Sequence, residues 1–389
     1  MSKLLIENAC VILADKVIKN SAILITDGKI SKIYSSGDKP DKRVDETINA
    51  NGNYLAPGFI DLHIHGLQNY LIDNGTEDLA QICKILPQYG VTGFLPTVCP
   101  LPKGKDAEFL SKLTNVKSTG AQILGFHLEG PFLALTGALP KEALGKADVE
   151  RVKNLITAAE PYKAIFSISP DFEDVTKLIP VMAENGCPVF ITHTKADVKQ
   201  TIDAIKAGAS HATHFYDVFH VPAETDGGVR PCGAVEAILA DKNVSVDFIL
   251  DGVHVDPIAI KMALQCKGND KVCLITDSNI GAGLGKGVYK FGNREVKIDY
   301  YGAPARLVEN GGLAGSGLTM DTAVKNAVSM LDIELPLAVK MASSNPAKVL
   351  KIDDRKGKIE EGYDADFVIM NDKLEVLQTW IKGNSCYKI

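Results

Sequence analysis

Imidazole and carboxylate side chains stand at the ends of several short apolar runs in this sequence. Residues 58–66 place His63 and His65 two positions apart on one such run. A carboxylate that directly follows an apolar strand is costly to desolvate unless it contacts a cation or hydrogen-bond donors. Imidazole and carboxylate groups are also the ligands that Zn²⁺ and Fe²⁺ accept. The pattern therefore predicts a metal site among the following residues: His63, His65, Glu129, His193, His214 and Asp277.

None of these residues is decisive by itself. A single histidine at a strand end is more often a hydrogen-bonded core residue, and His-x-His is a weak signal because alternate strand residues share a face. Glu129 or Asp277 alone would also suit a helix N-cap. Several such residues, each after a different predicted strand, favour metal binding. His127, His211 and His220 are interpreted as non-ligands, because they lie deeper in a strand, open a strand and occupy a loop, respectively.

Alternating strands and helices are needed to bring these distant residues together. We expect strands at residues 93–98, 123–128, 165–168, 189–192, 211–215, 244–250 and 272–276, and helices at residues 77–88, 147–158, 174–184 and 197–207. Near eight such units predict an α/β fold of the (β/α)8 TIM-barrel type, in which all strand carboxyl ends open onto one catalytic face. An open doubly wound sheet is the alternative, but no Gly-x-Gly-x-x-Gly fingerprint follows the first strand.

Both ends of the chain consist of short β-prone runs separated by turn signals. We expect strands at residues 4–6, 10–13, 22–26, 30–35, 366–370 and 376–381. Two unrelated frayed ends are one interpretation. A joint module is the other, and the resemblance described below favours it. The prediction is a small β-sandwich domain from residues 1–54 plus 352–389, flanking a barrel of residues 55–351.

Composition narrows the classes of partner. The formal charge of −6 and pI near 5.8 give no sign of a nucleic-acid-binding surface. The sequence contains no run of 18 apolar residues, so no membrane span is expected. The eight cysteines are scattered without a Cys-x-x-Cys pair, which is typical of reduced thiols. We therefore expect a soluble, cytoplasmic protein acting on a small molecule.

Motifs in order along nearly the whole chain carry a family resemblance. They are residues 58–66, His127-Leu128-Glu129-Gly130-Pro131-Phe132, Thr213-His214-Phe215, Asp251-Gly252-Val253-His254-Val255-Asp256, Ile275-Thr276-Asp277, Leu313-Ala314-Gly315-Ser316 and the tail motif 357–366. Together they resemble the N-acetylglucosamine-6-phosphate deacetylase family of the amidohydrolase superfamily. The Glu-Gly-Pro and Asp-Gly-x-His-x-Asp pieces are specific to that branch, whereas the His-x-His and tail motifs are found across the superfamily.

The resemblance implies a metal-dependent hydrolase. It implies that Glu129, His193 and His214 hold a principal divalent ion, Zn²⁺ in the first place and Fe²⁺ in the second. His63 and His65 are similar to ligands of a second ion that only some relatives possess, so one or two ions per chain are expected. A divalent ion lowers the pKa of bound water toward about 7.

The same resemblance makes Asp277 the acid/base residue. As the catalytic acid/base, Asp277 would take a proton during attack on an amide carbonyl and deliver it to the departing amine. It also implies a homodimer, in which Arg230 reaches the partner's site. An arginine suits a phosphate because its planar fork donates two parallel hydrogen bonds. A surface role for Arg230 is the alternative.

The resemblance places the substrate's phosphate near His254, Arg230, Asp217 and Val218. The remaining predicted substrate contacts are Ala138, Leu139 and Leu313.

This part of the sequence departs from the family pattern. Asp217-Val218-Phe219 stands where relatives usually carry Asn-Ala-Met, and an acid there would repel a phosphate unless it turned away or paired with Arg230. Leu139 stands where relatives commonly have a histidine that polarises the carbonyl.

Three functions follow for testing. The first is hydrolysis of N-acetylglucosamine-6-phosphate to glucosamine-6-phosphate and acetate. The second, prompted by Leu139 and Asp217, is hydrolysis of a different N-acyl, cyclic amide or lactone substrate within the superfamily. The third is a catalytically silent barrel kept as an interaction module, against which the intact set Glu129, His193, His214 and Asp277 argues.

Overall fold

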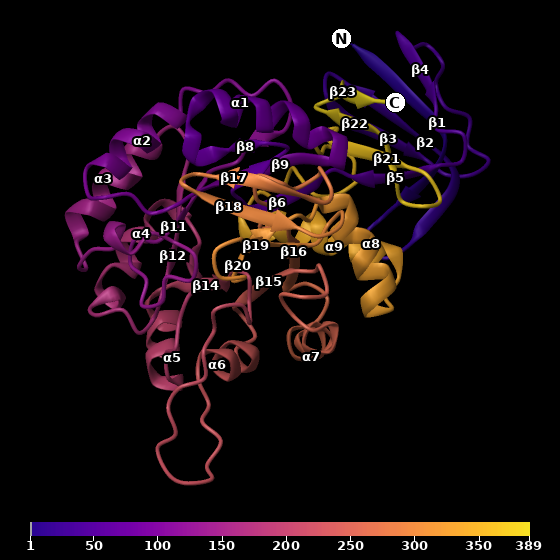
Figure 1. The fold of residues 1–389 in the computed structure, drawn as a ribbon. Helices are drawn as coiled ribbons and strands as arrows, with labels where there is room; N and C mark the ends of the chain where they lie inside the picture. Colours follow the sequence, from indigo (N-terminus) through magenta and orange to yellow (C-terminus); the bar gives the residue numbers. More distant parts are fainter. Residues whose placement is uncertain (1) are drawn as a thin grey trace.

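A parallel β-barrel forms the body of the molecule in the computed structural model, which describes residues 2–389 (Figure 1). Its strands are β6 (Phe59–Ile64), β9 (Val91–Val98), β11 (Phe126–Glu129), β12 (Ala164–Ile168), β13 (Val189–Ile191), β14 (Ala209–Ala212), β15 (Ser245–Ile249) and β16 (Val272–Ile275), with short β10 (Gln122–Ile123) beside β9. Every residue of β6, β9, β11, β12, β13, β15 and β16 is buried. Burial on both faces is typical of parallel strands covered by helices.

The seam between the last and first barrel strands is closed by hydrogen bonds. The Asp277 amide donates to the His63 carbonyl over 2.9 Å, and the His65 amide donates to Ser278 over 3.0 Å. Ile64 and Ser278 form a parallel bridge at the same place. The predicted (β/α)8 barrel is therefore confirmed, and its closure sets Asp277 directly beside His63 and His65.

A helix follows each barrel strand on the outside. These helices are α1 (Thr76–Ile85), α2 (Lys105–Leu113), α3 (Val149–Ala159), α4 (Ile179–Met182), α5 (Val198–Ala207), α6 (Ala234–Ala240), α7 (Pro257–Lys267) and α8 (Met320–Leu331). Asp197 and Gln200 form a capping box that starts α5. The helix predicted at residues 174–184 is shorter than expected: Pro180 lies in the first turn of α4, which is flanked by 3₁₀ turns.

The two chain ends meet in a second sheet at one side of the barrel (Figure 1). Its order is β23 (Asn384–Lys388), β22 (Val376–Ile381), β21 (Phe367–Met370), β5 (Tyr54–Pro57), β1 (Lys3–Ile12), β2 (Val17–Thr26) and β3 (Lys29–Tyr34), with β4 (Glu46–Asn49) paired to β1. The pairing of β5 with both β1 and β21 joins the ends. Phe367 and Trp380 stack in the core of this sheet. The domain limits 1–54, 55–351 and 352–389 remain our proposal.

An insertion between β16 and α8 is absent from the sequence prediction. It is a four-stranded antiparallel sheet of β17 (Gly287–Phe291), β18 (Arg294–Ile298), β19 (Pro304–Leu307) and β20 (Leu313–Ser316). The other elements are the hairpin β7 (Gly66–Leu67) and β8 (Tyr70–Leu71), and the helices α9 (Leu335–Ala342) and α10 (Ser344–Val349). Within residues 2–389, no helix combines the length and apolar character needed to cross a membrane.

Candidate metal centre

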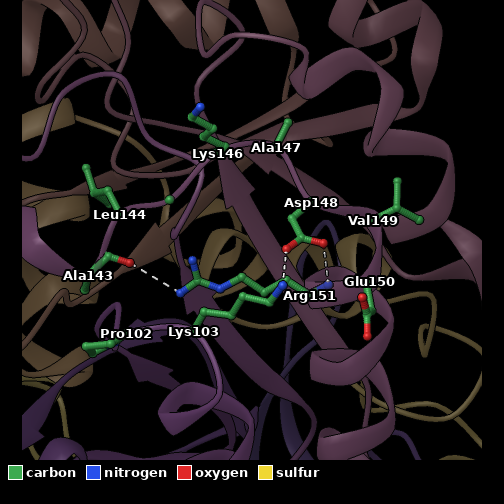
Figure 2. Close-up of a pocket in the computed structure, with 11 residues that line it drawn as sticks. Pro102, Lys103, Ala143, Leu144, Lys146, Ala147, Asp148, Val149, Glu150 and Arg151 are labelled. Carbon is green, nitrogen blue, oxygen red and sulfur yellow. Dashed lines mark hydrogen bonds and ion pairs between the residues drawn. The ribbon is translucent and has the colours of Figure 1, made fainter.

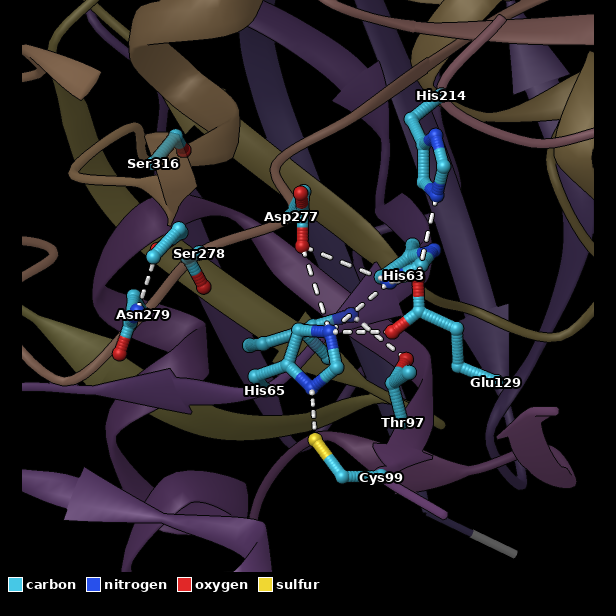
Figure 3. A network of polar contacts seen from close by, with 12 residues as sticks. His63, His65, Thr97, Cys99, Glu129, His214, Asp277, Ser278, Asn279 and Ser316 are labelled. Carbon is cyan, nitrogen blue, oxygen red and sulfur yellow. Dashed lines mark hydrogen bonds and ion pairs between the residues drawn. The ribbon is translucent and has the colours of Figure 1, made fainter. Parts of the chain in front are cut away.

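Glu129, the last residue of β11, lies at the centre of a histidine cluster (Figure 3). Its Oε1 is 3.1 Å from Nε2 of His193 and 3.1 Å from Nε2 of His214. Its Oε2 is 3.2 Å from Nε2 of His65. Four separate strand ends supply Glu129, His65, His193 and His214, so the barrel brings together residues far apart in the sequence.

His63 and Asp277 complete the cluster on the side of the barrel seam. His63 Nε2 lies 3.1 Å from His65 Nε2, 3.7 Å from Glu129 Oε1 and 3.5 Å from Asp277 Oδ1. His65 Nε2 is also 3.5 Å from the same Asp277 oxygen. Figure 3 shows the His63, His65 and Glu129 side chains converging on one point, with Asp277 above them.

The spacing of these donors fits a divalent metal. Two ligands held about 2.0–2.1 Å from an ion at a tetrahedral angle lie roughly 3.4 Å apart, close to the separations above. Ligand atoms of His63, Glu129 and His214 lie within 4.8 Å of one another, as do those of His63, His65 and Asp277. Nδ1 of His193 is buried without a hydrogen-bond partner. A buried polar atom of this kind is satisfied when an ion or water binds.

The backbone at the site is strained where three residues of the cluster leave their strands. His193, His214 and Asp277 all have left-handed φ values, of 48°, 33° and 45°. Residues other than glycine adopt this region at a cost, and they do so mainly where the surrounding structure holds them. Ser169 supplies part of that hold, because its hydroxyl donates to the His193 carbonyl over 2.7 Å.

Electrostatics follow from packing imidazoles against two buried carboxylates. Burial would raise the pKa of Glu129, but its electrostatic interaction with His63 and hydrogen bonds from His193, His214 and His65 hold it well below its usual range. Burial raises the pKa of Asp277 to about 6, although His65 opposes the shift. Burial acts to lower the pKa of His65, yet its contact with Glu129 raises it to about 9. A cation at this point would take the place of such imidazole protons.

A cavity of about 840 Å³ opens above the cluster. The predicted substrate residues that line it are Ala138, Leu139, Asp217, Val218, His254 and Leu313. The Asp251 carboxylate lies 2.7 Å from Nδ1 of His254, and Nε2 of His254 is buried without a partner. The sequence reasoning missed Lys141 and Arg294, which also line the cavity. Arg294 comes from the unpredicted insertion, so no strand-end pattern could have revealed it.

Arg230 does not line this cavity. Its side chain is 73% exposed, and its guanidinium donates to Glu236 over 2.6 Å instead of meeting Asp217. It belongs to the loop between β14 and α6, which projects away from the barrel at the bottom of Figure 1. In this conformation Arg230 is therefore not placed to contact a substrate in the cavity of its own chain.

A buried arginine, Arg151, bonds to two loops that line the cavity, and Figure 2 shows its contact with Ala143 in one of them. Its Nη2 donates to the Leu101 carbonyl over 2.7 Å and to the Ala143 carbonyl over 3.3 Å. Its Nε donates to Asp106 over 2.7 Å. Leu101 follows β9, and Ala143 follows the segment that carries Leu139, so one side chain sets the separation of both loops.

Other polar residues at the centre were not identified from the sequence. Cys99 Sγ lies 3.6 Å from Nδ1 of His65, and the Cys99 amide donates to Asp73 over 3.2 Å. Thr213 and Asp247 lie beneath His63 in the barrel interior. A carboxylate within the apolar strand β15 was the available signal for Asp247, but a polar residue inside a strand has many structural explanations.

Comparison with known proteins identifies the relatives of this chain. The amidohydrolase family model matches residues 54–386. An N-acetylglucosamine-6-phosphate deacetylase from Bacillus subtilis (strain 168) is 35% identical over 397 residues, covering 99% of this chain and 97% of the relative. An N-acetylgalactosamine-6-phosphate deacetylase from Escherichia coli O157:H7 is 31% identical, covering 85% of this chain and 86% of the relative.

A solved structure extends the comparison to the fold. It is an N-acetyl-D-glucosamine-6-phosphate deacetylase variant from Mycobacterium smegmatis in complex with N-acetyl-D-glucosamine-6-phosphate. It superposes with a TM-score of 0.89 at 25% identity and covers 100% of both chains. The barrel and the sheet built from the chain ends are therefore shared with that enzyme.

Proposed function

The chain belongs to the amidohydrolase family, in its N-acetylglucosamine-6-phosphate deacetylase branch, and we propose that it hydrolyses the N-acetyl amide of an amino-sugar 6-phosphate. The products are acetate and the free amino-sugar phosphate, glucosamine-6-phosphate in the first instance. The observation that carries the proposal is the cluster of Glu129, His193 and His214 beside Asp277, opening onto a cavity of about 840 Å³.

We propose that Glu129, His193 and His214 hold a divalent metal, Zn²⁺ by preference and Fe²⁺ as the alternative. His63 and His65 would hold a second ion. The separations of 3.1 Å between Glu129 Oε1 and Nε2 of His193 and of His214 support this assignment. Such an ion, when bound, polarises an amide carbonyl and makes water more acidic.

Asp277 is the proposed acid/base residue. Burial raises the pKa of its carboxyl to about 6 in the metal-free chain. In its ionised form Asp277 would accept a proton from the attacking water at Oδ1 and pass it to the amide nitrogen as the C–N bond breaks. The contacts of Oδ1 with His63 and His65 orient it toward the cluster.

His254 is the proposed contact for the sugar phosphate. Asp251 contacts Nδ1 of His254 and raises the pKa of the ring against the effect of burial. His254 lines the cavity, and its Nε2 is left without a hydrogen-bond partner, so this atom is the proposed phosphate contact. Ala138, Leu139, Val218 and Leu313 would shape the sugar site; Asp217 is the discordant residue.

We further propose a homodimer in which the exposed Arg230 reaches the phosphate in the partner subunit, and a cytoplasmic location. Exposure of this side chain on a projecting loop supports the first point.

Two features favour a second candidate function, in which the chain is a deacetylase or amidase of the same family that acts on another substrate. Asp217 places a negative charge in the cavity, and Leu139 offers no side-chain donor to the substrate carbonyl. The relative from Escherichia coli O157:H7 is also named for a different sugar epimer, N-acetylgalactosamine-6-phosphate.

A substrate panel tests the proposal. The metal-loaded chain is incubated with N-acetylglucosamine-6-phosphate, N-acetylgalactosamine-6-phosphate and unphosphorylated N-acetylglucosamine, and acetate is measured. We expect the highest kcat/KM for one of the two phosphorylated sugars. Preference for the unphosphorylated sugar, or no acetate from any of the three, would favour the second candidate.

A further inference from the structure

We propose that Asp247 is a positioning residue that, through the Thr213 hydroxyl, fixes the tautomer of His63 and so tightens binding of a metal ion at His63 and His65. The inference rests on the metal centre proposed above and not on the identity of the substrate. Asp247 lies within β15, and Thr213 follows β14, so neither belongs to the cavity lining. His63, Thr213, Asp247 and His211 are all fully buried, at 0% exposure.

The contacts form a continuous chain below His63. Nδ1 of His63 lies 3.2 Å from Oγ1 of Thr213, and that hydroxyl donates to Oδ1 of Asp247 over 3.2 Å. A carboxylate in this position accepts hydrogen bonds, whereas a hydroxyl has a single proton to give. Because Thr213 gives its proton to Asp247, its oxygen can only accept from His63.

This direction decides where the His63 proton sits. Nδ1–H must donate to Thr213, which leaves the lone pair of Nε2 facing His65, Glu129 and Asp277. A neutral imidazole binds a metal through the nitrogen that carries no proton. Partners of this kind around a metal-binding histidine fix the ring and commonly change metal affinity 10–100-fold.

Asp247 also supports the opposite half of the centre. Its Oδ1 accepts the His214 amide over 2.6 Å, and its Oδ2 lies 2.7 Å from Nε2 of His211. The His214 amide belongs to a residue with left-handed φ of 33°, so this bond helps to hold a strained ligand. One buried carboxylate therefore contacts the backbone of one proposed ligand and, through a hydroxyl, the ring of another.

The two variants Thr213→Val and Thr213→Ser separate positioning from simple packing. Valine removes the hydroxyl while keeping a branched side chain, and serine keeps the hydroxyl while losing a methyl group. Metal-free proteins are titrated with Co²⁺, followed by visible absorption and by elemental analysis. We expect Thr213→Val to weaken binding of the ion at His63 and His65 by roughly 10–100-fold. We expect Thr213→Ser to bind like the wild type.

Asp247→Ala makes a distinct prediction, because it removes support from both halves. Both binding events should weaken in that variant, whereas Thr213→Val affects only one. Should Asp247→Ala fail to fold, the threonine pair still decides the question.

A spectroscopic measurement adds a test that activity cannot supply. In ¹⁵N-histidine NMR of the metal-free chain, we expect His63 to carry its proton on Nδ1 in the wild type and in Thr213→Ser, but not predominantly so in Thr213→Val. An unchanged tautomer or unchanged Co²⁺ affinity in Thr213→Val would overturn the proposal. A wild-type chain that binds one ion without any contribution from His63 would overturn it as well. None of these readouts depends on deacetylation, so they stay separate from a failure of the proposed function.

Discussion

Oδ1 of Asp277 lies 3.5 Å from Nε2 of His65, across the seam where the last barrel strand meets the first. The residues stand more than 200 positions apart in the sequence, and the hydrogen bond from the Asp277 amide to His63 fixes their register. The proposed acid/base residue and the proposed ligands of a second ion therefore lie side by side at this seam. Substitution of Asp277 on one side of the seam tests catalysis, and substitutions around His63 on the other side test metal binding.

Replacing Asp277 with asparagine should remove turnover while sparing metal content. The amide keeps the size of the side chain but cannot accept and return a proton, so kcat should fall by roughly 10²–10⁴-fold. Acetate release and elemental analysis on the same preparation provide the measurement. Full activity in Asp277→Asn would refute its acid/base role; loss of metal in parallel with activity would assign it a ligand role instead.

The rate should depend on pH through the same carboxyl. Burial raises its pKa to about 6 in the metal-free chain, and a cation bound nearby would lower it. The base form exists above the pKa, so kcat should be constant near pH 8 and decline as the pH falls to 6 and below. Metal content is checked at each pH. A rate that rises on acidification, with metal retained, would contradict the assignment.

Asp217→Asn should improve the fit of a phosphorylated substrate. The wild-type carboxylate lines the cavity and pairs with no cation that the structure describes in residues 2–389. Removing a repulsion of about 1 kcal/mol would lower KM for N-acetylglucosamine-6-phosphate about fivefold. KM for the unphosphorylated sugar serves as the control and should not change. An equal change for both sugars would show that the effect of Asp217 is unrelated to the phosphate.

Much of this architecture could be predicted from the sequence. Strand-end positions identified His63, His65, Glu129, His193, His214 and Asp277, and the structure brings all six together. The prediction works because parallel barrel strands all end at one face, whatever the intervening helices do. The roles of these residues remain proposals for experiment.

Other features could not be predicted, for physical reasons. Asp247 and Thr213 act from within the barrel, where a polar residue in a buried strand resembles any satisfied core group. Arg294 enters the cavity from an antiparallel insertion that breaks the strand–helix alternation. Arg230 pairs with Glu236, six residues away, because its loop projects from the barrel, and strand-end positions carry no information on where such a loop goes.

Arg151→Met should destabilise the fold and loosen the loops at the cavity mouth. It would leave Asp106 and the Leu101 carbonyl without their buried partner, at a cost of about 3–5 kcal/mol. Denaturant unfolding measures this loss. Lys103→Met is the matched control, because the Lys103 side chain is 56% exposed and solvent screens its pairing with Asp148, so its loss should be much smaller. Equal small losses in the two variants would show that the Arg151 contacts contribute little.

The most direct test of the central claim is metal-dependent acetate release from N-acetylglucosamine-6-phosphate. The chain is stripped with a chelator, assayed, and assayed again as Zn²⁺ is restored in steps. We predict no turnover without metal, then activity that rises with bound zinc, with one acetate and one free amine formed for each substrate consumed. Turnover by the metal-free chain, or none by the fully loaded chain, would contradict this account.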